Sequence, residues 1–591
     1  MSNSKITKIQ TFLKWLDSNI MLLLAGFLIA FIPLYPKLPL FDIIPGYIVR
    51  VRLEDIFVAI ACLIWLIQVK RKKIEWKNSV FYFIAAYIFV AFLSLLSGVF
   101  IIKTIPLEAI HFGKSFLHFL RYIEYFALFF ITFSSIKSIK DTRTIVTIFA
   151  LTVLGASIYG WGQKYYYWPV YSTMNREFSK GMRLYLTEHA RVQSTFGGHY
   201  DLAAYLVIVL CLLLTLAYKE ENKTKKIFYH LVHLAGLWLM IVAASRTSFV
   251  SYLIASLLVI LMIAVGKDTI GQKLKWGINR FILLTFSILI LIFFFGQDMS
   301  ERLIQVVDNY PIVTNTYAQL TLQKQQFTNW IAMTFDFQEA DVPKDGMSVE
   351  ELQQQLEENN IIVPTDQRPV PEKPEDVYID VPDYMQVATI SATGEKIIIL
   401  VEKERTWSQN AIKYGLSMAI RLDTLWPNAI KGFKRNPILG SSYATLNKET
   451  FQQFTEAEST DNNYLRTLGE TGILGFISFY GGILLCLNIA KNFIRDKDYF
   501  ISALSIGFIA ASIGLLINAT YIDVFAASKV AFTYWSLAGM TVGSYYLKQN
   551  KKTLKKIYFR PCIFHKCSWY ERYCVKILQL IDHLFQKVFK R

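Results

Sequence analysis

The stretch from Thr460 to Leu485 reads TDNNYLRTLGETGILGFISFYGGILL. Its first residues are polar, whereas its last part is apolar enough to enter a lipid bilayer. Gly469, Gly472 and Gly475 recur every third residue, which places them on one helical face that a neighbouring helix or a substrate can approach closely. The stretch predicts a polar segment held at a membrane surface, although a plain loop entering a membrane helix, with glycines used for packing, explains the same spacing.

Composition predicts the fold class. The chain has 591 residues, of which 53% are hydrophobic, and a mean hydropathy of +0.34. The apolar residues come in blocks of about 20, the length that crosses a bilayer as a helix. We therefore expect an all-α polytopic membrane protein with about twelve transmembrane helices. The expected spans lie near 20–35, 56–69, 80–102, 119–136, 145–162, one after 200, two within 226–267, and near 281–296, 472–489, 500–518 and 527–547.

The net charge of +17 indicates topology and does not indicate nucleic-acid binding. The basic residues form short clusters between apolar blocks, such as Lys70–Lys73 and the segment 136–143. Cytoplasmic loops of membrane proteins carry this excess of Lys and Arg. We expect a multi-pass protein of the cytoplasmic (inner) membrane with both termini cytoplasmic and the large loop external.

The loop lengths predict four regions. Residues 1–296 form an N-terminal membrane domain of about nine spans, 297–471 an external loop, 472–548 a C-terminal membrane domain of about three spans, and 549–591 a basic cytoplasmic tail. The external loop contains an insertion at about 336–404 that is rich in Asp, Glu, Gln and Pro. In this insertion, a capping box at 348–351 predicts a helix through about residue 358. The β-branched runs in 387–401 surround a Thr-Gly-Glu turn and predict a hairpin, so a small α+β insertion is expected.

Three further segments carry positively charged side chains at the ends of spans. Residues 226–267 contain only Arg246 as a charged side chain between their terminal lysines, and a straight helix of that length would be about twice the thickness of the hydrocarbon core. The chain must therefore turn near Arg246, where Thr247 and Ser248 are expected to cap the descending helix. Arg191 precedes another span, and Arg421 lies on the polar side of an amphipathic surface helix over 415–434.

The segment Asp461-Asn462-Asn463-Tyr464-Leu465, followed by Glu470, Gly472 and Gly475, resembles the "His-Asn-x-Tyr-Leu … Glu-x-Gly-x-x-Gly" pattern of the O-antigen ligase and O-antigen polymerase superfamily. Asp461 stands where the family usually has His. The Arg191-x-x-Ser-Thr-Phe-Gly segment and Ser245-Arg246-Thr247 resemble the two arginine motifs of that superfamily. Arg421, Trp426-Pro427 and Asn436-Pro-Ile-Leu-Gly resemble its approach to the catalytic segment.

The resemblance implies a membrane glycosyltransferase that moves a glycan from a polyprenyl-diphosphate carrier to an acceptor hydroxyl at the outer face. It implies that Arg191, Arg246 and Arg421 bind the diphosphate of the lipid-linked donor. Asp461 and Glu470 are the expected catalytic residues, supported by Asn462, Tyr464, Thr247 and Ser248. The acceptor is a glycan, a lipid or a protein. No cofactor is implied, and no His, Asp or Glu cluster has metal-ligand spacing.

The identity of the base stays open at this point. A carboxylate with an ordinary pKa near 3.9 is a weak base at neutral pH unless desolvation raises that pKa. Glu470, His189 or His199 are therefore alternatives to Asp461. Arg191 has the alternative role of an arginine that reaches the lipid headgroups.

Two other classes of protein fit the same sequence. A transporter or flippase of lipid-linked oligosaccharide would act on the same substrate, but such folds usually have paired repeats and helices broken at mid-membrane. A catalytically inactive relative acting in glycan assembly would explain why the motif His is replaced by Asp461.

Overall fold

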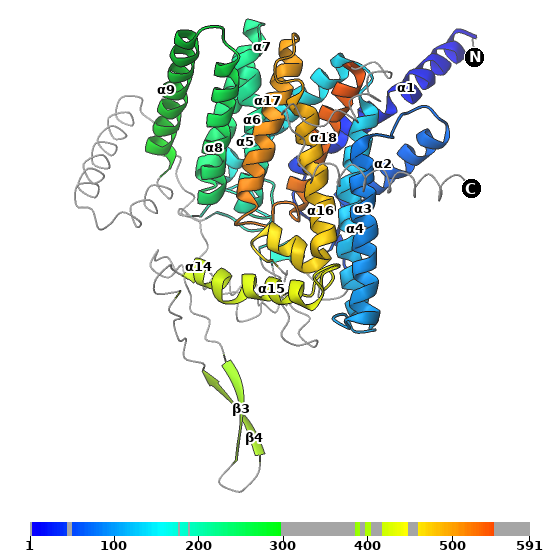
Figure 1. Cartoon of the computed structure of the whole chain (residues 1–591), viewed down its shortest axis with the longest axis vertical. Helices are drawn as coiled ribbons and strands as arrows, with labels where there is room; N and C mark the ends of the chain where they lie inside the picture. Colours follow the sequence, from blue (N-terminus) through cyan, green and yellow to red (C-terminus); the bar gives the residue numbers. More distant parts are fainter. Residues whose placement is uncertain are drawn as a thin grey trace, which may run out of the picture.

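The computed structural model describes residues 3–43, 50–174, 178–186, 190–296, 384–390, 396–402, 410, 416–446 and 459–548. They form a bundle of long helices with short elements at one end (Figure 1). The long helices are α1 (Asn3–Leu34), α2 (Leu53–Lys70), α3 (Ser79–Leu96), α4 (Ala109–Ser135), α5 (Ile139–Tyr165), α6 (His199–Lys219), α7 (Lys223–Val242), α8 (Arg246–Val265), α9 (Ile270–Phe295), α16 (Asn463–Lys491), α17 (Tyr499–Asn518) and α18 (Ser528–Lys548).

Polar side chains fix where several of these helices begin. The side chain of Asn78 accepts a hydrogen bond from the backbone N–H of Phe81 at the start of α3. Ser138 and Asp141 form a capping box at the start of α5. Thr269 caps α9, so this helix begins at Ile270, well before the span expected near 281–296. Each cap satisfies backbone N–H groups that the first helical turn leaves without partners.

The core of the bundle lies around α6 and α17, which pack against each other and are almost wholly buried. Helix α18 packs against α4, where Gly539 brings the two backbones together: a Cβ there would lie 2.3 Å from the carbonyl oxygen of Phe129. Helix α9 is at the periphery and leaves apolar side chains such as Phe281 and Phe286 exposed. A helix with such an exposed apolar surface is stable when lipid covers it.

The chain is a polytopic membrane protein. Within the described residues, ten helices are long and apolar enough to cross a membrane. Helices α2 and α18 occupy the two other expected span positions but are not among these ten. The all-α membrane class is therefore confirmed, while the count of about twelve spans and the domain boundaries stay predictions.

The elements outside the bundle are short. Strands β1 (Pro39–Phe41) and β2 (Val51–Arg52) form a small antiparallel pair before α2. Strands β3 (Tyr384–Ile390) and β4 (Lys396–Glu402) form the expected antiparallel hairpin, with Tyr384 opposite Glu402. The helix expected over 348–358 lies outside the described residues, as does the basic tail at 549–591.

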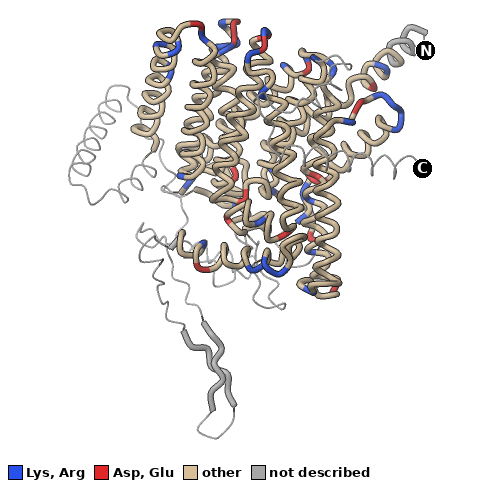
Figure 2. Tube along the Cα trace, in the orientation of Figure 1, with Lys and Arg blue, Asp and Glu red and all other residues tan. Residues whose placement is uncertain are grey.

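The two ends of the bundle differ in character. Three consecutive elements cross one end: α14 (Leu416–Ile420), the π-helix η4 (Arg421–Leu425) and α15 (Trp426–Arg435). Figure 2 shows a concentration of Lys and Arg at the other end, where α6 is followed by α7 and α16 by α17. Lys431, Lys434 and Arg435 lie on α15 at the first end, so the orientation, with the basic loops cytoplasmic and the surface helix external, stays a prediction.

Candidate functional site

The candidate site is built around the start of α16. The side chain of Asn462 accepts hydrogen bonds from the backbone N–H groups of Tyr464 (3.1 Å) and Leu465 (3.0 Å), so it caps the helix. Asp461, directly before the cap, has a left-handed backbone with φ of 50°. Few side chains other than glycine adopt this conformation, and Asp and Asn are among those that do so more readily. The predicted supporting residue Asn462 therefore sets the position of Asp461.

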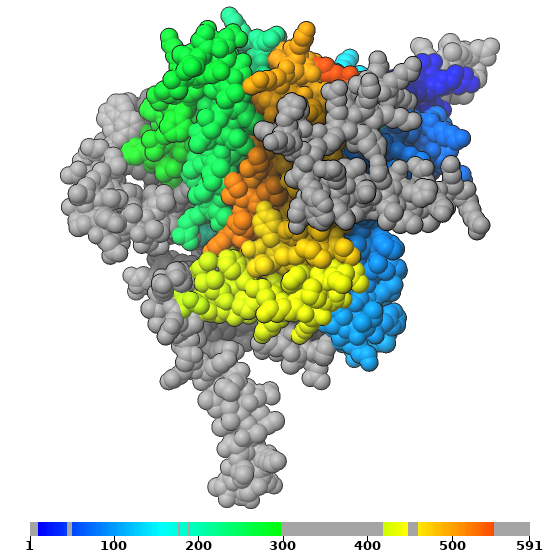
Figure 3. All heavy atoms as spheres, in the orientation of Figure 1, coloured from blue at the N-terminus to red at the C-terminus, as the bar shows by residue number. Residues whose placement is uncertain are grey.

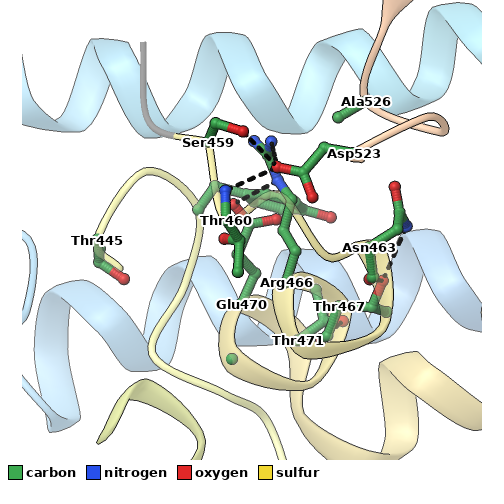
Figure 4. Close-up of polar contacts among 12 residues, drawn as sticks. Thr445, Ser459, Thr460, Asn463, Arg466, Thr467, Glu470, Thr471, Asp523 and Ala526 are labelled. Atoms are coloured by element: carbon green, nitrogen blue, oxygen red, sulfur yellow. Dashed lines mark hydrogen bonds and ion pairs between the residues drawn. The ribbon is translucent and has the colours of Figure 1, made fainter. Parts of the chain in front are cut away.

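Asp523 holds this turn in place, and sequence reasoning missed it. Its carboxylate accepts hydrogen bonds from the backbone N–H groups of Thr460 (2.7 Å) and Asn462 (3.1 Å), and it shares the single hydrogen of the Ser459 hydroxyl (3.1 Å) with Asp461 (Figure 4). It also pairs with Nη1 of Arg466 at 3.1 Å. Because its side chain is only 8% exposed, these four donors replace the water that would otherwise solvate its charge.

Asp461 forms an ion pair with Arg421, the first residue of the π-helix η4. Its Oδ2 lies 2.8 Å from Nη2 of Arg421, and its Oδ1 accepts a 2.6 Å hydrogen bond from the Ser459 hydroxyl. The Asp461 side chain is 29% exposed, so it is accessible from outside the protein. The structure thus brings together two predicted site residues that are distant in the sequence.

The pKa of the Asp461 carboxyl lies above the ordinary value of 3.8. Burial is the largest cause because it disfavours the charged form, and the nearby charge of Asp523 acts in the same direction. The hydrogen bond from Ser459 and the charges of Arg421 and Arg466 act in the opposite direction. The direction is the one that a carboxylate needs to act as a stronger base.

Arg421 is held by an aromatic ring as well as by Asp461. Its guanidinium lies 4.0 Å from the ring centroid of Tyr521, a cation–π geometry. The Tyr521 hydroxyl contacts the sulfur of Met418 in α14 at 3.6 Å. Tyr521 and Asp523 both belong to residues 519–527 between α17 and α18, which we call the hub loop. The hub loop therefore positions both partners of the Asp461–Arg421 pair.

Glu470 lies in a buried ion pair one turn beyond Arg466. Its Oε1 is 3.2 Å from Nε of Arg466, and its residue is 3% exposed. Its backbone carbonyl accepts hydrogen bonds from the Ser94 hydroxyl (2.7 Å) and from the N–H of Ser442 (3.0 Å). Arg466 thus bridges Glu470 and Asp523, as Figure 4 shows. This geometry favours a structural role for Glu470, whose catalytic role stays a prediction.

Tyr464 also has structural contacts. Its hydroxyl donates to the backbone carbonyl of Leu516 at 2.7 Å, and its ring stacks on Tyr480 with centroids 4.9 Å apart. The first contact fixes the start of α16 against α17, and the second joins it to a later part of α16.

A break in α16 lets the turn after α15 pack against this helix. Gly472 has φ of 65°, and a Cβ on it would lie 2.3 Å from the carbonyl oxygen of Ile438. Asn436 caps the turn through hydrogen bonds from the N–H groups of Ile438 and Leu439. The backbone N–H of Ile473 then donates to the carbonyl of Pro437 at 2.9 Å. A backbone segment therefore approaches Gly472 closely, but at a break in α16 and not on the continuous helical face that the spacing predicted.

Arg191 lies in the segment before α6, where its Nη1 is 2.6 Å from Nε2 of His199. His199 is the first residue of α6 and is buried, whereas His189 lies outside the described residues. The N–H of Val192 donates to the carbonyl of Val242 at 3.2 Å, which joins this segment to the end of α7.

Arg246 is exposed and opens α8, directly after the expected turn. The structure corrects the expected cap: Ser245 occupies the N-cap position, and no side chain makes a capping hydrogen bond there. Ser248 instead accepts hydrogen bonds from Ser245 (3.1 Å) and from the side chain of Asn518 (2.9 Å). Ser248 is therefore tied to the end of α17, and Thr247 has no capping role.

The segments of Arg246 and Asp461 are linked where α17 runs into the hub loop, and the Arg191 segment is joined to the end of α7, just before Arg246. Asn518, which binds Ser248, ends α17, and the next residue accepts a 2.9 Å hydrogen bond from the N–H of Asn463. The side chain of Asn462 donates to the carbonyl of Thr520 at 3.0 Å. Among the described residues, no hydrogen bond or ion pair joins Arg191 or Arg246 to Asp461.

The described residues contain no group of three or more His, Cys, Asp and Glu side chains placed to hold a metal ion. No family model matches the chain, and a search of curated proteins finds no match. What the fold defines is the class of the protein, a polytopic helical membrane protein with an ionised, partly exposed site at one end of its bundle.

Proposed function

We propose that this protein is a membrane glycosyltransferase of the O-antigen ligase or polymerase type. It transfers a glycan from a polyprenyl-diphosphate carrier to an acceptor hydroxyl at the outer face of the cytoplasmic membrane. The observation that carries the proposal is that hydrogen bonds tie the Arg246 and Asp461 segments to the end of α17 and the hub loop, and the Arg191 segment to the end of α7 beside Arg246.

In the proposed reaction, the acceptor hydroxyl oxygen attacks the anomeric carbon of the donor sugar. Asp461 takes the hydroxyl proton, and its partly exposed carboxyl and raised pKa support this role. The bond between the anomeric carbon and the diphosphate oxygen breaks, and the polyprenyl diphosphate leaves with the electron pair.

Three arginines support the leaving group in this proposal. Arg246 opens α8 beside backbone N–H groups that lack a side-chain cap, an arrangement that favours phosphate oxygens. Arg191 lies on the segment that is hydrogen-bonded to Val242 at the end of α7, and α7 ends just before the turn that leads to Arg246. Arg421 moves between its ion pair with Asp461 and the diphosphate, which would couple donor binding to release of the base.

The ion pair between Arg421 and Asp461 also favours a second candidate, an inactive relative acting in glycan assembly. Each oxygen of the Asp461 carboxylate has a partner, Arg421 or Ser459, so the residue can also be present only to hold the structure together. The two candidates differ in whether transfer depends on the Asp461 carboxylate.

The test is a gene deletion followed by analysis of surface glycans and of lipid-linked intermediates on each side of the membrane. The proposal expects loss of transfer, with carrier-linked glycan accumulating at the outer face. Complementation with Arg246→Lys should restore the amount of protein in the membrane but little glycan transfer, because Lys keeps the charge and loses the planar bidentate donor. Lys275→Arg, at an exposed position near the start of α9, is the matched control. Accumulation at the inner face would instead identify a flippase.

A further inference from the structure

A separate cavity of about 320 Å³ lies beside the basic cluster Lys70–Lys73, whose last residue lines it. It is formed where α1 meets the end of α2 and the turn between α4 and α5. Three of its eight lining residues are lysines, and Asp17 is its only acidic one. The lining residues are Lys14, Asp17, Ser18, Met21, Gln68, Lys73, Ile74 and Lys137.

The carboxylate of Asp17 does not neutralise this cavity. It forms a bidentate ion pair with Arg71, with oxygen–nitrogen distances of 2.5 and 3.0 Å, and a second pair with Lys73. Two cations therefore already share its single charge. The ammonium group of Lys137 donates a hydrogen bond to the backbone carbonyl of Ser18, and this carbonyl carries no net charge. An excess of positive charge remains for an anion.

Lys14 is the most available of these cations. It is exposed, and within the described part of the chain it forms no hydrogen bond or ion pair. A side chain on the solvent side of a basic cavity, with its charge uncommitted, can bind an anionic group without breaking a contact of the protein.

The apolar neighbours of the cavity indicate an amphiphilic ligand. Met21 and Ile74 line it beside the lysines. On the same helix, Phe12, Leu13 and Trp15 are at least half exposed. An anionic headgroup beside Lys14 would place its acyl chains along these apolar side chains, whereas a free phosphate ion would leave them uncovered.

We propose that this cavity binds the headgroup of an anionic phospholipid, with the lipid phosphate held by Lys14 and Lys137. The site lies apart from the candidate transfer site and does not depend on the proposed function. Basic pockets between transmembrane helices on the cytoplasmic side are suited to such headgroups. The lipid anchors the N-terminal part of α1 against α2 and the turn after α4.

The experiment uses the purified full chain in nanodiscs of phosphatidylcholine that contain increasing fractions of phosphatidylglycerol. Thermal unfolding gives the fraction of phosphatidylglycerol at which stabilisation is half-maximal. Lys14→Gln should raise this fraction by about fivefold, the effect expected for one basic contact with an anionic lipid surface. Lys275→Gln, an exposed lysine near the start of α9 that does not line the cavity, should raise it less than Lys14→Gln.

Lys14→Gln and Lys137→Gln together should remove most of the stabilisation. If the double variant fails to fold because Lys137 also binds Ser18, the single Lys14 variant still decides the question. The proposal is overturned if phosphatidylglycerol does not stabilise the unaltered protein, or if Lys14→Gln and Lys275→Gln respond alike. Equal stabilisation by inorganic phosphate alone would overturn the assignment to a lipid.

Discussion

At the scale of single residues, the chemistry of the candidate site depends on which groups surround Asp461. The ion pair with Arg421 and the hydrogen bond from Ser459 favour its charged form, while burial and Asp523 oppose it. Burial is the largest of these influences, so the pKa is raised.

This balance predicts the pH dependence of transfer. A general base acts when deprotonated, so the rate should fall as the pH drops through the raised pKa of Asp461. Ser459→Ala removes a hydrogen bond that lowers this pKa, and the acid side of the profile should therefore move to higher pH. Ser478→Ala, elsewhere on α16, is the control. A profile that Ser459→Ala leaves in place would show that Asp461 is not the titrating base.

A second residue prediction concerns Asp523. Asp523→Asn replaces one of its acceptor oxygens by an NH₂ group that faces N–H donors, and it leaves Arg466 with only part of its compensating charge. Breaking a buried pair of this kind costs about 3–5 kcal/mol, so the unfolding temperature should drop clearly. Asp498→Asn should have little effect, because Asn caps the start of α17 as well as Asp. Equal unfolding temperatures for the two variants would contradict the role of Asp523.

The sequence predicted Asp461, Asn462 and Arg421 as site residues, but it did not indicate Asp523 or Arg466. The motif gave no role to the residue between Leu465 and Thr467, and Asp523 lies in the short connection between two apolar spans. A charged residue so close to two membrane helices costs free energy unless it is paired. This cost was a signal that Asp523 has a specific partner. Its four donors come from residues about sixty positions earlier, a pairing that no local pattern contains.

At the scale of elements, every expected span coincides with a helix, but the helix ends differ from the expected ones. Helix α16 begins at Asn463 and α9 at Ile270. The capping side chains of Asn462 and Thr269 determine these starts, and the point where the sequence becomes apolar does not. The turn before Arg246 was predictable because a helix cannot exceed the bilayer thickness without leaving it. The π-helix η4 was not predictable, since its sequence has the same amphipathic pattern as an ordinary α-helix.

The break in α16 gives a prediction for one element. Gly472→Ala places a Cβ against the Ile438 carbonyl at a residue with φ of 65°, so it should destabilise the protein by about 1–3 kcal/mol or more and displace the turn after α15. Gly482→Ala on the same helix meets its nearest atom at 3.4 Å and should be tolerated. Thermal unfolding of both purified variants measures the difference. Similar stability would mean that the break is not required.

At the scale of the whole molecule, the membrane class follows from composition, whereas the site depends on tertiary structure. Length, hydropathy and basic clusters predicted a polytopic bundle with two different ends. The placement of the Arg191, Arg246 and Asp461 segments relative to one another depends on how α7, α8, α16 and α17 pack, which hydrophobic periodicity alone does not determine.

The orientation of the bundle is tested by cysteine labelling in intact cells. Lys434→Cys on α15 should react with a membrane-impermeant reagent, because Lys434 is exposed and α15 lies on the surface (Figure 3) at the predicted external end. Lys72→Cys, exposed at the other end, should react only after permeabilisation. Labelling of Lys72→Cys in intact cells would reverse the orientation and place the candidate site inside.

The measurement that tests the central claim most directly is glycan transfer by the purified, reconstituted protein from a polyprenyl-diphosphate-linked donor. The unaltered chain, Asp461→Asn, Asp461→His and Glu470→Gln are compared at equal folded concentration. The account predicts transfer by the unaltered chain and a loss of at least about 100-fold in Asp461→Asn. Asp461→His should be more active than Asp461→Asn, because it places His where the motif that this segment resembles has it. Full activity in Asp461→Asn would contradict the account.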